Sequence, residues 1–138
     1  MSWIYWALLS AVFAALTAIL AKIGVAGVDS NIATAIRTSV IVVFTWAIAL
    51  IGSRGAAMPT SRRTWLFLTL SGIATGLSWL CYFRALQLGP ASRVAPVDKL
   101  SVVLVIIFAA LVLGERLTPA KIAGGALIFA GAIILALE

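Results

Sequence analysis

The sequence has few charged residues for its size. Charged side chains make up 10% of the 138 residues, whereas about a quarter of a typical soluble domain is charged. Apolar residues make up 64% of the chain, which leaves too little polar surface to cover a water-soluble fold. The scarcity of charge therefore excludes an ordinary soluble domain and indicates that the chain's partner is the lipid bilayer.

Histidine is absent and cysteine is nearly so. Without histidine, a transition-metal site or histidine-based catalysis is not expected. Cys81 is the only cysteine, so no internal disulfide can form. The sequence has no phosphate-binding loop, nucleophile elbow or paired carboxylates, so we expect neither an enzyme nor a cofactor. The ten cations are scattered rather than interleaved with aromatics, which argues against nucleic acid as a partner.

Five apolar stretches approach the length needed to cross the membrane. About 20 apolar residues span the roughly 30 Å of hydrocarbon as a helix, and a lipid-exposed backbone must satisfy its own hydrogen bonds. The first stretch has no basic side chain before Lys22, so we expect a retained helix rather than a signal peptide. The sequence thus predicts an all-α membrane protein with one domain over residues 1–138 and helices at about 3–25, 32–51, 64–86, 94–113 and 119–137.

Two prolines bear on the ends of these helices. Pro96 lies near the start of the fourth span, where it either begins the helix or kinks it. Thr118 can cap the fifth helix, with Pro119 in the first turn, where a missing N–H costs nothing.

The cations are distributed unequally between the two sides of the predicted bundle. Among the cations of the connectors, only Arg93 lies on the side opposite to the N-terminus. The positive-inside rule then predicts a cytoplasmic N-terminus and an external C-terminus in a bacterial-type inner (cell) membrane. Lys22, Arg37 and Arg84 lie toward the outer side and weaken this difference in charge. Insertion of the chain in both orientations is therefore an alternative. The cations of the N-terminal side are Arg54, Arg62, Arg63, Arg116 and Lys121.

Five ionisable side chains lie within the predicted spans: Lys22, Arg37, Arg84, Asp98 and Lys99. Each costs up to about 2.5–3.5 kcal/mol near mid-membrane. At ~1.5 Å of rise per residue, all five lie at a similar depth toward the outer side. Either the long side chains snorkel to the headgroups, or the cluster forms a net-positive vestibule that attracts an anionic or zwitterionic solute.

Asp98 stands out among these five residues because its side chain is too short to snorkel far. We therefore expect it to pair with Lys22, Arg37 or Arg84. Substitution of Asp98 by asparagine is expected to impair folding or transport. We expect the five charged residues to line or gate the substrate pathway.

Small residues recur at the spacing of helix contacts. Gly72 and Gly76 form a G-x-x-x-G motif in the third span. Ala120 and Gly124 repeat that spacing in the fifth span, where Gly131 follows. Small residues allow helices to approach closely, so these glycines serve packing within one bundle or association of subunits through the fifth span.

Three motifs in the second half of the chain are typical of one transporter family. From Tyr82 the sequence reads Y-F-R-A-L-Q-L-G-P-A-S-R-V-A-P, followed by L-G-E-R-L-T and then by G-G-A-L-I-F-A-G-A-I-I-L-A-L. The chain resembles a single five-helix repeat of the EamA family, in the drug/metabolite transporter superfamily. Arg37 matches an arginine that is common early in the second helix of that family. The sequence V-D-K-L-S-V at 97–102 departs from the family, because Ser101 takes the place of the proline of a Pro-Val pair.

The resemblance implies a transport mechanism. Most members carry two such repeats in opposite orientations, with the substrate site between the halves. This chain is then half of an inverted-repeat transporter for a small metabolite or drug, acting by alternating access as a homodimer or with a paired half. A more distant resemblance is to small multidrug resistance proteins, whose first-helix glutamate is missing here. The alternative is a non-transporting membrane scaffold or regulatory subunit.

Overall fold

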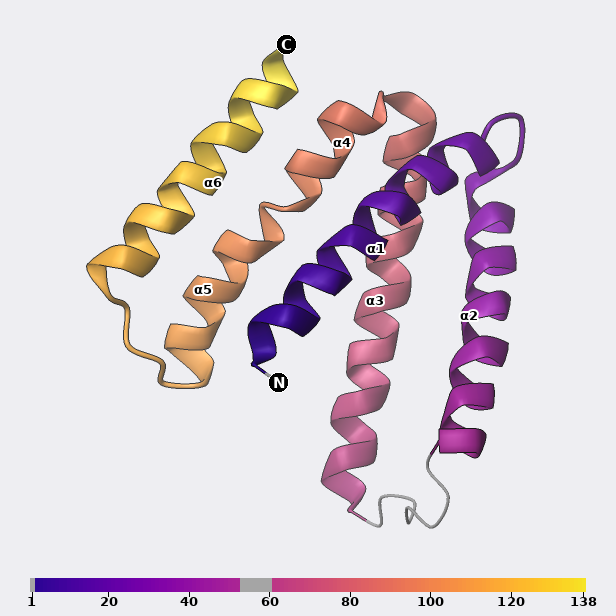
Figure 1. Cartoon of the computed structure of the whole chain (residues 1–138), viewed down its shortest axis with the longest axis horizontal. Helices are drawn as coiled ribbons and strands as arrows, with labels where there is room; N and C mark the ends of the chain where they lie inside the picture. The colour runs from indigo at the N-terminus through magenta and orange to yellow at the C-terminus, as the bar shows by residue number, and fades with distance from the viewer. Residues whose placement is uncertain (1, 53–60) are drawn as a thin grey trace. The chain divides into compact units, whose positions relative to one another are not determined.

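The computed structural model describes residues 2–52 and 61–138 (Figure 1). These residues form helices and no strand. The connector at 53–60, which carries Arg54 of the predicted cytoplasmic side, lies outside the described residues. The helices are α1 (Trp3–Gly24), α2 (Ser30–Gly52), α3 (Arg62–Leu88), α4 (Ala91–Asp98), α5 (Ser101–Val112) and α6 (Pro119–Leu137).

Five stretches of the described chain are long and apolar enough to cross a membrane. They are α1, α2, α3, α6 and the consecutive pair α4 and α5, which together cover Ala91–Val112. At most 11% of the residues in their apolar windows are buried, so nearly all of this apolar surface is open to lipid or to a partner. The predicted all-α fold with five spans is confirmed, and the chain is a multi-pass membrane protein.

The fourth span differs from the prediction in its start and in its continuity. It begins at Ala91 rather than near residue 94, directly after Pro90, whose extended backbone (φ −69°, ψ 145°) precedes the first helical turn. Pro96 does not begin the helix but lies inside α4. The span is interrupted after Asp98 and resumes at Ser101.

The chain divides into two compact units, which are described separately. Unit 1 comprises Met1–Lys22 and Leu88–Glu138, and unit 2 comprises Ile23–Gln87. Within unit 1, α6 packs against both α4 and α5 (Figure 1). A Cβ placed on Gly125 of α6 would lie 3.5 Å from Cδ1 of Ile106 on α5, so an alanine side chain at this position would be in ordinary contact with the neighbouring helix.

The turn between α5 and α6 explains part of the L-G-E-R-L-T motif. Gly114 has a positive φ of 68°, which glycine adopts without steric cost. The backbone N–H groups of Leu113 and Glu115 both donate to the carbonyl of Ala109 at 3.1 Å, which closes the end of α5. Thr118 then accepts from the N–H of Lys121 at 3.3 Å, so the predicted cap of the last helix is confirmed.

In unit 2 the buried residues gather where α1 ends, α2 begins and α3 ends. They are Val25, Ser30, Thr34, Phe83 and Leu86. Asp29 caps α2, because its Oδ1 accepts from the backbone N–H of Asn31 at 2.8 Å and of Ile32 at 3.2 Å. The end of α1, the start of α2 and the end of α3 therefore meet at this corner of unit 2.

Candidate functional site

The interruption of the fourth span has an identifiable cause. Pro96 has no N–H to donate, so one carbonyl in the preceding turn loses its helical partner. Beyond it, the N–H of Lys99 is shared between the carbonyls of Ala95 at 3.3 Å and Pro96 at 3.1 Å, and the N–H of Leu100 donates to the carbonyl of Val97 at 3.0 Å. The bonds thus change from four residues apart to three, which forms a turn between α4 and α5.

The charged pair Asp98–Lys99 lies at this interruption. Lys99 Nζ and Asp98 Oδ2 are 3.1 Å apart, and the two side chains are 57% and 34% exposed. The predicted partners of Asp98 were other cations, whereas the ion pair seen here is with its neighbour. Because the span begins at Ala91, Asp98 is its eighth residue, roughly 10 Å along the helix. The pair is thus a neutral dipole set well inside the membrane span.

Arg37, on α2, is held by the aromatic side chains of α3. Its guanidinium carbon lies 4.2 Å from the ring centroid of Trp79 and 5.5 Å from that of Phe83. A guanidinium over an aromatic face is attracted by the ring quadrupole, and the attraction grows as water is removed. The guanidinium thus lies against two aromatic rings of α3 within unit 2.

Lys22 contributes to the end of α1 and to the turn that follows α3. Its Nζ donates to the carbonyl of Gly89 at 2.8 Å, and the side chain is half-buried. A cation near the last carbonyls of a helix interacts favourably with the negative end of its dipole. The geometry seen here is therefore that of a helix-terminal contact.

Arg84 also makes a defined contact, although its side chain is exposed. It donates to Oε1 of Gln87 at 3.0 Å, and Nε2 of Gln87 donates to the carbonyl of Val28 at 2.5 Å. This relay ties the α1–α2 turn to the end of α3 within unit 2. Gln87 was not among the predicted site residues, because nothing in the sequence shows that residues 28 and 87 meet.

The five predicted site residues thus fall into two groups. Lys22, Asp98 and Lys99 lie in unit 1, while Arg37 and Arg84 lie in unit 2. The structure brings Asp98 and Lys99 into direct contact. The predicted convergence of all five at one depth remains a prediction.

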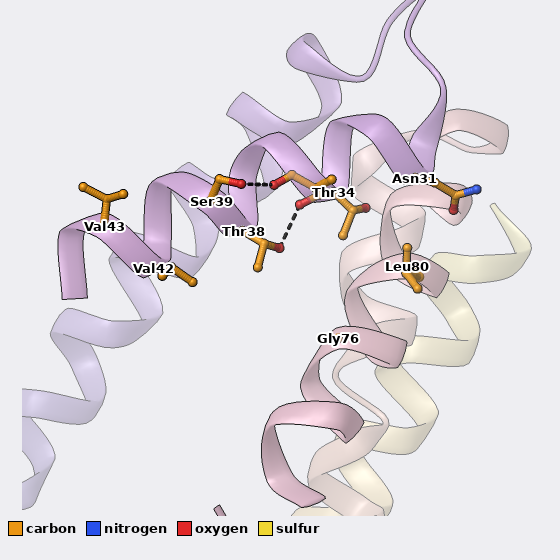
Figure 2. A pocket seen from close by; sticks show the side chains of 9 residues that line it. Asn31, Thr34, Thr38, Ser39, Val42, Val43, Gly76 and Leu80 are labelled. Atoms are coloured by element: carbon orange, nitrogen blue, oxygen red, sulfur yellow. Dashed lines mark hydrogen bonds between the residues drawn. The ribbon is translucent and has the colours of Figure 1, made fainter. Parts of the chain in front are cut away.

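A groove in unit 2 has polar side chains that the sequence analysis did not select. It lies between α2 and α3 and has a volume of about 550 Å³. Figure 2 shows Asn31, Thr34, Thr38 and Ser39 along α2, with Gly76 and Leu80 on α3 across from them. Asn31, Thr34 and Thr38 recur three to four residues apart, which places them along one side of a helix. That spacing is the signal by which the sequence could have indicated the groove.

The predicted packing glycines face open space in the described part of the chain. Around Gly72, Gly76, Gly124 and Gly131, no atom beyond the adjacent residues and the backbone of the same helix lies within 4 Å of where a Cβ would stand. These glycines are therefore available to a partner helix or to a solute. Their role in helix packing stays a prediction.

The acidic side chains do not assemble into a cation site. Among residues 2–52 and 61–138, no three histidine, cysteine, aspartate or glutamate side chains come together as metal ligands would. Besides Asp98, Glu115 has an ion-pair partner, Lys121 at 2.9 Å.

Comparison with known proteins gives two matches. The sequence model of the EamA-like transporter family matches residues 1–137. The chain is also similar to a Sinorhizobium sp. protein described as an uncharacterized transporter in the cobO 3' region. The two are 57% identical over 136 residues, which cover 98% of this chain and 96% of that relative. No solved structure matches the chain.

Proposed function

The chain belongs to the EamA-like transporter family, and on that premise we propose that it is one half of a small-solute carrier that works as a dimer by alternating access. Family membership and the similarity to a protein described as a transporter support a transport role. One repeat of five spans cannot enclose a pathway by itself, which supports pairing with an inverted copy or a related half.

The observation that carries this proposal is the interrupted fourth span with Asp98–Lys99 at its break. Transporter sites are typically built from discontinuous helices, whose free backbone ends and nearby charges hold the solute near mid-membrane. A charged pair inside a span is costly and marks a pathway more often than a packing position. We assign Asp98 and Lys99 to the pathway, with Arg37, Lys22 and Arg84 as further pathway or gating residues.

The summed charge of the five proposed pathway residues supports the proposed class of solute. Four cations and one carboxylate leave a net positive balance, which favours an anionic or zwitterionic solute. The proposed location is a bacterial-type inner membrane, with the N-terminus in the cytoplasm and the C-terminus outside.

The orientation of the C-terminus tests the dimer. Fusions of the C-terminus to alkaline phosphatase, which is active only outside, and to a fluorescent protein that folds only inside would report each population. Signal from both fusions is expected if the working unit is an inverted homodimer. Signal from phosphatase alone would rule out that homodimer and require a separate half of opposite orientation.

A scaffold role is favoured by one observation, the open glycines on α3 and α6, which offer close approach to a partner helix. Purified protein reconstituted alone into liposomes separates the two functions. Uptake of radiolabelled small carboxylates or zwitterions supports the carrier. Absence of uptake in vesicles shown to hold both orientations would favour the scaffold.

A further inference from the structure

Unit 2 carries two adjacent cations at the end where α3 begins. Arg62 and Arg63 are the first two residues of α3. Asp29 is the only acidic residue in the sequence of unit 2, and it lies before the start of α2. The contacts of Arg37, early in α2, with the late turns of α3 show that the two helices are antiparallel (Figure 1). The two arginines and Asp29 therefore lie at opposite ends of this helix pair.

Arg62 and Arg63 have no counter-charge within unit 2. The 23 residues of α2 correspond to on the order of 30 Å of rise between Asp29 and this end, whereas charges more than about 8 Å apart are largely screened in physiological salt. Neither arginine is in an ion pair with a residue that the structure describes. The turn between α5 and α6 differs, because there Lys121 is paired with Glu115 at 2.9 Å.

The two arginines also lie beside exposed aromatic side chains at the edge of a membrane span. The span formed by α3 begins at Arg62 itself. The guanidinium carbon of Arg63 lies 5.7 Å from the ring centroid of Phe67, one turn further along the helix. Phe67 is 58% exposed and Trp65 is 52% exposed, and tryptophan is typical of the headgroup level of a bilayer. Positive charge and open apolar surface thus occur together at this edge.

We propose that Arg62 and Arg63 bind the headgroup of an anionic phospholipid, whose acyl chains lie along the exposed first turns of α3. Guanidinium groups match phosphate oxygens with paired donors. A headgroup with net negative charge balances the arginines, whereas phosphatidylcholine brings a cation of its own. Leu66 and Leu70, which are exposed on the same turns, offer apolar surface to the acyl chains. The proposal requires that α3 spans a membrane and does not depend on transport.

Two lipids with identical acyl chains test the headgroup. Native mass spectrometry of the full chain in detergent measures the binding of phosphatidylglycerol and of phosphatidylcholine. Phosphatidylglycerol is expected to bind about tenfold more tightly, as the attraction of two arginines near the headgroup level would give. Equal affinity for the two lipids would overturn the proposal.

The headgroup without its acyl chains distinguishes a lipid from a soluble anion. Glycerophosphoglycerol, added at the same concentration as phosphatidylglycerol, should leave the bound lipid in place, because it cannot use the apolar surface of α3. Displacement of the lipid by this compound would mean that the arginines hold a soluble phosphate, and the lipid would be ruled out.

Variants locate the preference at the start of α3. In Arg62→Gln/Arg63→Gln, the preference for phosphatidylglycerol should fall to near unity. Arg116→Gln/Lys121→Gln is the matched control, because it removes two cations next to Glu115, with which Lys121 is already paired. It should keep most of the preference. An equal loss in both variants would mean general attraction to a cationic protein and would overturn the site.

Thermal unfolding in nanodiscs makes the same test in a bilayer. The unfolding temperature of the unmodified chain should be higher with phosphatidylglycerol than with phosphatidylcholine, and Arg62→Gln/Arg63→Gln should remove the difference. If the double variant does not fold, Arg63→Gln alone should lower the tenfold preference in binding to about threefold. A difference that persists unchanged in a folded variant would overturn the proposal.

Discussion

Two regions of this molecule place a charge inside the membrane by different means. At Asp98–Lys99 two opposite charges neutralise each other where the helix is interrupted. At Arg37 the helix continues, and a lone cation rests on the aromatic faces of Trp79 and Phe83. The first arrangement depends on a neighbour in sequence, and the second depends on the tertiary pairing of α2 with α3. A charged side chain can therefore lie within a span whose helix is not interrupted. The functional effect of the charge and that of the interruption can be tested by separate substitutions.

The largest effect is expected from Asp98→Asn, which leaves Lys99 without its counter-charge. Stability should fall by about 2–3 kcal/mol, the cost of an unpaired charge in a span, and flux should fall at least about tenfold. Thermal unfolding in detergent and uptake by proteoliposomes measure the two quantities. Adding Lys99→Gln should recover stability without recovering flux.

Glu115→Gln provides the matched control for that experiment. It breaks a pair of similar length, 2.9 Å, between side chains that are more evenly exposed, so less than about 1 kcal/mol should be lost. If Asp98→Asn behaves like Glu115→Gln in both assays, the pair at the break has no special role and the comparison fails.

An intermediate effect is expected at the aromatic stack. In a double-mutant cycle between Arg37→Gln and Trp79→Leu, the coupling free energy should be about 0.5–2 kcal/mol. The cycle cancels the packing lost with the indole ring. Pairing Arg37→Gln with a substitution of Trp46, a residue that is 52% exposed, to leucine should give no coupling. A coupling near zero at Trp79 would mean that the stack does not hold the guanidinium.

The smallest effect is expected where a cation meets a backbone carbonyl. Lys22→Met removes the bond to Gly89 and should cost about 0.5–1 kcal/mol of stability, the usual size of a polar contact in a membrane bundle. Arg84→Met, which loses only an exposed contact with Gln87, should cost less. A loss of flux in Lys22→Met with unchanged stability would move Lys22 from a structural role to the pathway.

Much of the fold followed from the sequence, because length and apolarity alone decide what can cross a bilayer. The number of spans and the cap at Thr118 needed no tertiary information. The break after Asp98 was hidden by the apolar run that follows it, which continues through Val112 without a turn residue. Only the switch to bonds three residues apart reveals that break.

The sequence predicts less of the candidate site than of the fold, for a geometric reason. Counting residues gives the depth of a charge in the membrane but not its direction around the helix. The partner of Arg37 therefore required the pairing of α2 with α3. The sequence does not single out the hydroxyls of the groove, because threonine and serine are common in membrane spans. There their hydroxyls donate to backbone carbonyls of the same helix.

The turn at Gly114 bears on the order in which the chain assembles. It reverses direction between the end of α5 at Val112 and the start of α6 at Pro119, so the packing of α5 against α6 joins helices that are consecutive in the sequence. Short loops lose little entropy on closure, and local contacts form fastest. The α5–α6 hairpin should therefore form soon after both helices are inserted. The contacts of α4 with α6 span all of α5 and should follow it.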